Sequence, residues 1–505
     1  MAGFILALLV TIGVAYLIFK RYNPQTVLLF AGIIMLSLAI VLPDSGVARP
    51  EDWPNTGNVL LDVFDHVRYL FATTGAQLGL IIMAVGGFSL TMEKIGASEV
   101  LVRYAVKPLS KINKPYLVLA STYILAQCLC LIIPSAAGLA MLLMVTVYPL
   151  LRGMGISRLS AAAVIATGSC LDLGPASSNA NIAASVSNMT VQEYFVQYQL
   201  PVAVVVMAVV FTMHYFTQRY FDKKAGTTPD KADWDDIRRE RAGEITDASR
   251  SGTPTQQVTP ESRDGHQIVT EAEENAEEEK RKKDLAPSWY ALIPFTPLVL
   301  LIIFSPFVID TIKLPVATAM IVSAMVGVIA EMIRYRSFHK AGDVFKVFFE
   351  GMGRQFTNIV SLIIAAQMFA AGLTQLGFIQ TIIDSAQDAN FGAIPITVIL
   401  TLIILLAAVV TGSGNAPWFA FSDLVPDVAQ SAGVQPVFMA QPMELASGIG
   451  RSMSPVAGVV IAVSGLAGVN PMDVVKRTAP VMIAAYITMV ITSIIWDHFA
   501  SSLFF

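Results

Sequence analysis

The sequence predicts an all-α polytopic membrane protein made of two inverted repeats, each with five transmembrane helices and one re-entrant hairpin. Composition, the placement of charge and paired motifs in the two halves predict this fold. Of the 505 residues, 55% are hydrophobic and 14% are charged, whereas soluble domains average about 45–50% apolar and about 25% charged residues. This composition excludes a secreted domain, a nuclear protein and an ordinary cytosolic enzyme. The formal net charge is only −4, so no strong field favours nucleic acid.

Ten apolar segments have the length of a membrane-spanning helix. A helix needs about 20 apolar residues to cross the hydrocarbon core. The first segment reads as a retained span rather than a cleavable signal, because it lacks a basic start and a small-residue cleavage site. The predicted spans are 3–19, 25–42, 77–92, 159–185, 200–218, 289–309, 315–333, 355–373, 438–466 and 479–497.

Two other apolar stretches, 115–151 and 395–434, predict re-entrant hairpins. Small, polar and proline residues interrupt each stretch at its middle, at 134–138 and at 411–417. Backbone inside a membrane breaks only where protein or a water-filled cavity satisfies its polar groups. The spans 159–185 and 438–466 contain similar interruptions, and we expect each of them to be a broken helix.

Charge placement predicts the orientation and a central linker. Residues 222–287 hold 29 of the 70 charged residues, which predicts a disordered cytoplasmic linker; a regulatory amphipathic helix around 271–283 is the alternative. Because cytoplasmic loops carry an excess of Lys and Arg, both termini are expected outside. Lys and Arg lie in one set of loops (93–114, 152–158, 334–346 and 476–477) and are absent from the other (186–199, 374–394 and 422–437).

Matched motifs near an offset of about 280 residues divide the chain into repeats 1–221 and 288–505. Ser135 pairs with Ser413, segment 171–175 with 451–455, and segment 196–201 with 475–480. Each repeat contains five spans. Since five is odd, the second copy enters the membrane with the opposite orientation, and inverted repeats of this kind are common in secondary transporters, with the substrate near the midplane.

The breaks in the hairpins and broken helices are the candidate substrate site. A broken helix exposes backbone N–H groups at a half-helix N-terminus, where partial positive charge favours carboxylates and phosphates. Hydroxyl and amide groups there add neutral hydrogen bonds, although small polar residues that merely pack helices closely are the alternative reading. The predicted substrate-binding residues at the breaks are Ser135, Ser177, Ser178, Asn179, Ser413, Gly414, Asn415, Ser452 and Ser454.

Arg451 is the most informative single residue, because it lies well inside an apolar span. A central arginine costs about 2.5–3.5 kcal/mol on insertion scales, and its guanidinium suits bidentate binding of a substrate carboxylate. A structural ion pair or a snorkelling arginine is the alternative. Asp172, at nearly the matching place in the other repeat, is expected to pair with Arg451 without substrate, to carry a coupling proton, or to have no role. Asn181 and Glu444 are further coupling candidates.

Two long motifs resemble those of a known family. The segments TGSGNAP at 411–417 and GRSMSP at 450–455 closely resemble the anaerobic C4-dicarboxylate carriers of the DcuC family. Weaker similarity includes Gly86-Gly87-Phe88, Ile156-Ser157 and the segment 220–224. More loosely, the paired hairpins and broken helices look like those of the ion transporter superfamily.

The resemblance implies exchange or proton-linked transport of succinate, fumarate, malate or aspartate across the inner membrane. It also implies an elevator mechanism, in which a transport domain slides against the scaffold of a homodimer. The coupling ion, H+ or Na+, stays open, and no other cofactor is expected. A carrier for another organic anion, such as citrate or an amino acid, is the alternative. An ion channel is a further alternative, but re-entrant hairpins with an asymmetric charged site fit an alternating-access carrier better.

The sequence offers no catalytic or metal site. It contains no HExxH motif, and its five histidines are scattered. The cysteines Cys128, Cys130 and Cys170 lie in apolar runs without CxxC spacing, so we expect small core residues rather than metal ligands. An enzyme is therefore not expected.

Overall fold

The computed structural model describes residues 2–20, 22–41, 56–227, 286–304, 311–312, 314–378, 381 and 392–503. All regular secondary structure in these ranges is helical. Within them, seven helices are long and apolar enough to cross a membrane, and five shorter apolar helices accompany them. The orientation of the termini stays a prediction.

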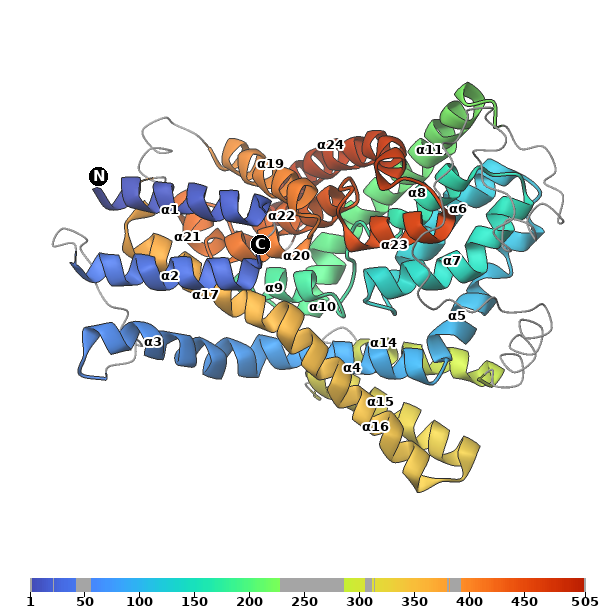
Figure 1. Ribbon diagram of the computed structural model, residues 1–505, viewed down its shortest axis with the longest axis horizontal. Coiled ribbons are helices and arrows are strands. Elements are labelled where there is room, and N and C mark those ends of the chain that lie inside the picture. Colours follow the sequence, from blue (N-terminus) through green and yellow to red (C-terminus); the bar gives the residue numbers. More distant parts are fainter. Residues whose placement is uncertain are drawn as a thin grey trace, which may run out of the picture.

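One group of helices packs together along one side of the molecule (Figure 1). Three of its members run side by side, and the long helix α16–η6–α17 crosses them diagonally, so that α17 packs on α2 and α16 packs on α4. We call this group the scaffold. Its helices are α1 (Ala2–Phe19), α2 (Pro24–Val41), α3 (Val59–Leu70), η1 (Phe71–Gly79), α4 (Leu80–Lys94), η5 (Ser288–Phe295), α14 (Thr296–Ile303), α15 (Val316–Tyr335), α16 (Phe338–Gln355), η6 (Phe356–Val360) and α17 (Ser361–Gln375).

Two scaffold helices are much longer than the sequence predicts. The predicted span 77–92 is the end of a 36-residue helix from Val59 to Lys94, and the predicted span 355–373 belongs to a 38-residue helix from Phe338 to Gln375. Both added parts, α3 and α16, are amphipathic and carry charged residues. A search for continuous apolar runs therefore ends at these charges, although one face of each helix is apolar.

Glycines allow the two long helices to cross closely. A Cβ on Gly87 would lie 2.7 Å from the carbonyl oxygen of Phe348, and a Cβ on Gly351 would lie 2.6 Å from the carbonyl oxygen of Gly86. Real Cβ atoms do not approach backbone oxygen this closely, so the contact between α4 and α16 requires glycine at both positions.

The remaining helices form a second group, which we call the core group. Its centre is α22, which packs against α19, α24 and α9, while α11 and α24 lie along each other (Figure 1). Its helices are α5 (Ala97–Val106), η2 (Leu109–Lys111), α6 (Pro115–Cys130), α7 (Ala136–Gly153), α8 (Arg158–Ala166), α9 (Ser178–Val186), α10 (Val191–Glu193), η3 (Tyr194–Gln199), α11 (Leu200–Lys224), α19 (Ala393–Thr411), α20 (Asn415–Ser422), α21 (Val425–Ser431), α22 (Pro436–Arg451), α23 (Gly458–Ala467) and α24 (Pro471–Leu503).

Helical structure is interrupted at four places in the core group, where a short non-helical segment separates two helices. These breaks lie between α6 and α7, α8 and α9, α19 and α20, and α22 and α23. Local chemistry sets three of the boundaries. The hydroxyls of Ser135 and Ser177 accept hydrogen bonds from Gly138 N and Ala180 N and thereby cap α7 and α9. Gly412 ends α19 with a φ of 72°, a conformation that favours glycine.

The first half of the chain ends in a helix that continues past residue 221. Helix α11 extends to Lys224, and the side chain of Asp222 is fully buried. The predicted linker thus begins with residues that belong to the packed fold. Residues 228–285, including the alternative helix 271–283, lie outside the described residues, so the linker stays a prediction.

Candidate functional site

A cavity of about 200 Å³ lies where the breaks of the core group meet the scaffold. Several predicted site residues line it from different breaks. The scaffold contributes one wall, from α4, the end of α16 and η6. The lining residues are Val85, Cys130, Pro134, Ser135, Ala136, Asp172, Leu173, Ala176, Ser177, Ser178, Asn179, Gln355, Ile359, Asn415 and Arg451.

Arg451 and Asp172 form an ion pair at this cavity. The Nη2 atom of Arg451 lies 3.0 Å from Asp172 Oδ1 and donates a second hydrogen bond, of 2.9 Å, to the Ser169 carbonyl. The two side chains are only 14% and 15% exposed. Of the three alternatives for Asp172, pairing with Arg451 is present in this structure.

The pair leaves part of the guanidinium unused. Within the described residues, only Nη2 of Arg451 donates a hydrogen bond, and Nε and Nη1 have no acceptor. Gly414, a predicted site residue outside the cavity lining, packs beside the guanidinium, and a Cβ there would lie 3.5 Å from Nη1. Arg451 can therefore keep Asp172 and still donate to a ligand.

The turn that carries Asp172 is held in an unusual conformation. Asp172 has a φ of 44°, which is uncommon for a residue other than glycine. The amide Nδ2 of Asn179 donates to Asp172 Oδ2 at 3.1 Å. Helix α22 approaches this turn at Gly448, where a Cβ would lie 3.2 Å from Asp172 Oδ2. These contacts fix the carboxylate toward Arg451.

Sequence comparison identifies the family. A family model described as the C4-dicarboxylate anaerobic carrier DcuC matches residues 3–498. The chain belongs to the DcuC family. It is 33% identical to the anaerobic C4-dicarboxylate transporter DcuC of Escherichia coli over 97% of this chain and 96% of that protein. A probable DcuC transporter of Vibrio cholerae is 34% identical, with 98% of both chains covered.

Two solved transporters share the fold of this DcuC-family protein. MtrF of Neisseria gonorrhoeae superposes with a TM-score of 0.56 at 13% identity, covering 94% of this chain and 95% of that one. The YdaH transporter of Alcanivorax borkumensis gives a TM-score of 0.57 at 13% identity, covering 95% and 99%. The predicted all-helical polytopic membrane fold is thereby confirmed. Since the DcuC family contains transporters, the prediction that the chain is not an enzyme is also confirmed.

Three predicted serines of the DcuC-family chain lie outside the cavity lining and bond to nearby backbone. Ser413 Oγ accepts from Ala416 N at 3.2 Å, and Ser454 Oγ accepts from Val456 N at 3.3 Å. Ser452 Oγ donates to the Gly448 carbonyl at 3.0 Å. In this structure they shape the breaks rather than face the cavity.

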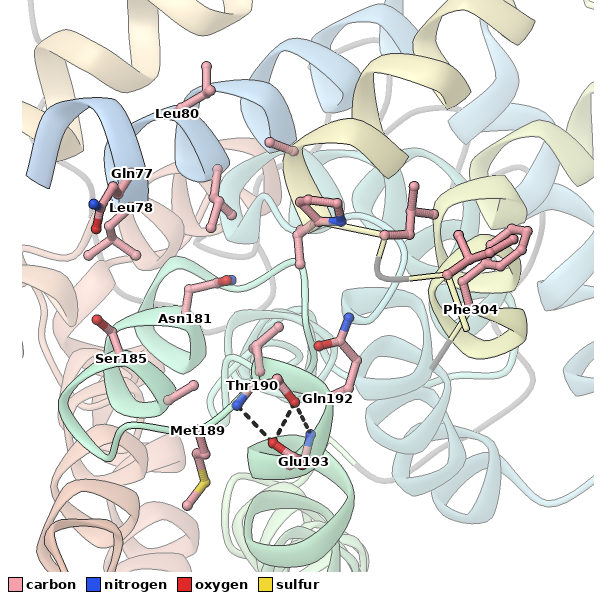
Figure 2. Close-up of a pocket in the computed structure, with 18 residues that line it drawn as sticks. Gln77, Leu78, Leu80, Asn181, Ser185, Met189, Thr190, Gln192, Glu193 and Phe304 are labelled. Atoms are coloured by element: carbon pink, nitrogen blue, oxygen red, sulfur yellow. Dashed lines mark hydrogen bonds between the residues drawn. The ribbon is translucent and has the colours of Figure 1, made fainter. Parts of the chain in front are cut away.

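Asn181 lies at a second, larger cavity of about 830 Å³, whose lining shares no residue with the first (Figure 2). Its side chain donates to the carbonyls of Pro175 and Ser177 at 2.8 and 2.7 Å, which stabilises the break. Across this cavity, Gln77 of η1 and Phe304 after α14 belong to the scaffold, whereas Ser185 and Gln192 belong to the core group. This cavity lies between the scaffold and the core group, and we call it the vestibule.

Glu444 lies away from both cavities, fully buried inside the core group. The Tyr194 hydroxyl donates to it at 3.2 Å, and Gln199 Nε2 lies 3.2 and 3.1 Å from its two oxygens. Trp418 packs behind the site and donates from Nε1 to the Asn179 carbonyl at 3.2 Å.

The scaffold wall of the cavity was not predicted from the sequence. Val85, Gln355 and Ile359 line it from α4, α16 and η6. The sequence signal that could have indicated this wall was the glycine pair Gly86-Gly87, since Gln355 packs directly against Gly86. Among the described residues, no group of three or more His, Cys, Asp or Glu side chains could hold a metal ion.

Proposed function

We propose that this DcuC-family protein is a secondary active transporter of C4-dicarboxylates such as succinate, fumarate, malate and aspartate, by exchange or ion-coupled transport. The observation that carries the proposal is Arg451, which lines the cavity and whose Nη1 atom has no acceptor among the described residues. Nη1 can donate to one oxygen of a substrate carboxylate, and the two parallel hydrogen bonds typical of a guanidinium form when the substrate also replaces Asp172 at Nη2. The family membership and the named relatives support the same substrate class.

Three helix N-termini at the cavity support an anionic substrate. Ala136, Ser178 and Asn415 are the first residues of α7, α9 and α20, and all three line the cavity. The N-terminus of a helix carries partial positive charge and free N–H groups. With Arg451 and these three helix N-termini in its lining, the cavity offers separate partners for two carboxylates.

The size and lining of the cavity support a small, hydrophilic substrate. Its volume is about 200 Å³, and Ser177, Asn179 and Gln355 supply neutral hydrogen-bonding groups. Such groups replace part of the hydration shell that a dianion loses on entering the membrane.

An elevator mechanism with inverted repeats is our proposal for the movement. The order of elements in the first half, from α1 to α11, recurs in the second half from η5 to α24. The cavity lies between the scaffold and the core group, so sliding of the core group would carry the substrate past the scaffold wall. In this proposal the vestibule, lined by residues of both groups, is the route by which the substrate reaches the cavity from one membrane face. Homodimerisation, an inner-membrane location and both termini outside complete the proposal.

The test is transport by the purified protein in proteoliposomes. Vesicles preloaded with fumarate should take up labelled succinate, and excess unlabelled malate or aspartate should inhibit this uptake. A monocarboxylate of similar size, such as butyrate, is the control and should not compete. If no C4-dicarboxylate moves or competes, the substrate class is wrong, and competition by citrate or amino acids would then define another organic anion.

A further inference from the structure

A buried carboxylate without a cationic partner lies two helical turns from Arg451. Glu444 and Arg451 are seven residues apart on α22, which places them on the same face of the helix. Glu444 is fully buried. The described residues give it hydrogen bonds from Tyr194 and Gln199, and they give it no ion pair.

Burial without a cation makes the ionised form of this side chain costly. Moving a carboxylate out of water carries a large desolvation cost, which a paired cation normally offsets. Glu331 in the scaffold shows the contrast. It is also buried and also accepts from a tyrosine, Tyr290, but Arg334 lies 3.2 Å from it. Glu444 likewise accepts a hydrogen bond from a tyrosine, Tyr194, but among the described residues no arginine pairs with it.

The charged and titratable groups around Glu444 leave it without a basic neighbour. Helices α19, α20 and α9, which pack on α22, contain no titratable residue. On η3, Tyr194 donates to Glu444, and the titratable side chains next along, Asp497 near Tyr194 and Asp172 near Glu444, are acidic rather than basic. Arg477 of α24 is paired with Asp222, Asp427 of α21 is exposed, and Arg451 is paired with Asp172.

Hydrogen bonds connect Glu444 to the turn of the substrate site through the side chain of Gln199. Gln199 donates to Glu444 with Nε2 and accepts from Gly174 N with Oε1 at 3.0 Å. Gly174 is two residues from Asp172, the partner of Arg451. Loss or gain of a proton on Glu444 therefore changes a hydrogen-bonded chain that ends at the Asp172 turn.

We propose that Glu444 is the proton-binding site that couples transport to a proton gradient. This inference rests on the proposed dicarboxylate transport. A dianion at Arg451 adds negative charge near Glu444, which favours its protonated form, and by reciprocity a proton on Glu444 favours the dianion. Glu444 takes the proton from the aqueous phase on the side where substrate enters. It releases that proton on the opposite side after the substrate leaves, so both move in the same direction.

The test compares two transport modes of Glu444→Gln in proteoliposomes. Glutamine imitates the protonated side chain at every pH but cannot release a proton. Exchange of internal fumarate for labelled succinate should stay within about threefold of wild type. Succinate uptake into empty vesicles under an inward proton gradient should fall at least tenfold. Glu444→Asp should recover gradient-driven uptake, and the control Glu99→Gln, whose ion pair with Arg103 is partly exposed, should retain both modes.

Three outcomes would overturn the proposal. Glu444→Gln could keep gradient-driven uptake, or the folded variant could lose exchange together with it. Wild type could exchange dicarboxylates but ignore the proton gradient, for example by responding only to sodium, and this result does not depend on any variant. Absence of exchange in the wild type would instead refute the proposed dicarboxylate function.

Discussion

Asp222 and Arg477 join the two halves of the chain through an ion pair of 2.6 Å, 7% exposed on the arginine and 0% on the aspartate. The carboxylate also accepts from Ser157 and Ser160 at 2.6 and 2.9 Å and from Tyr116 at 3.2 Å. One buried charge therefore holds α6, α8, α11 and α24 together.

Removal of one partner of this pair should destabilise the fold strongly. Asp222→Asn leaves the Arg477 guanidinium buried without a counter-charge, which costs about 3–5 kcal/mol in comparable pairs. We expect a clearly lower melting temperature in detergent for Asp222→Asn and for Arg477→Gln. The double variant should lose less stability than the two single losses added together, because neither charge is then left unpaired.

The exposed pair Asp473–Lys476 is the control for this experiment. Its nitrogen–oxygen distance is 2.8 Å, but the side chains are 47% and 68% exposed. Exposed pairs contribute about 0–1 kcal/mol, so Lys476→Gln should leave the melting temperature nearly unchanged. Equal effects of Lys476→Gln and Arg477→Gln would contradict the importance of burial.

Arg451 should be essential for substrate affinity. Arg451→Gln removes the donors of the guanidinium and leaves Asp172 without its ion-pair partner. Truncation of a buried, hydrogen-bonded charge costs about 2–5 kcal/mol of binding free energy, which corresponds to a loss of about 30-fold or more in succinate affinity. Arg451→Lys retains the charge without the planar fork, and its affinity should be intermediate. Binding can be measured calorimetrically on detergent-solubilised protein, and unchanged binding by Arg451→Gln would exclude Arg451 as the residue that binds a substrate carboxylate.

Gly448 should be intolerant of a side chain because of the turn behind it. A Cβ there would lie 3.1 Å from the Cys170 carbonyl carbon and 3.2 Å from Asp172 Oδ2. Gly448→Ala must displace the Asp172 turn, and overpacking of this kind costs about 1–3 kcal/mol. We expect at least a tenfold rise in the KM of succinate exchange. Gly465→Ala on α23 is the control, since no atom lies within 4 Å of the added Cβ, and it should transport normally.

The helix breaks could be predicted from the sequence because their causes are local. Ser135, Ser177 and Gly412 mark helix boundaries through their own side chains or backbone conformation. Arg451 was detectable because a charge inside an apolar run is rare. The predicted site residues that line the cavity therefore come from the breaks themselves.

The features that the sequence does not predict depend on contacts between residues that are far apart in the chain. Gln355 reaches the cavity only because α16 crosses α4 at Gly86, and no local pattern specifies that crossing. Asp222 stands at the start of a highly charged segment and was assigned to the linker. Its buried environment comes from Ser160 and Arg477, which are 62 and 255 residues away.

Ser178 offers a direct test of whether the small cavity holds the substrate. It is the first residue of α9 and lines the cavity, so a cysteine there should react with a small thiol reagent. The background should replace Cys130, which also lines the cavity, and the exposed Cys128 by serine. We expect succinate to slow the modification of Ser178→Cys at least fivefold, because the bound dianion occupies the space that the reagent needs. Butyrate should have no effect.

Gln192→Cys in the vestibule is the comparison. If the substrate binds at Arg451, this cysteine should react at the same rate with or without succinate. Protection of Gln192→Cys alone would move the binding site to the vestibule.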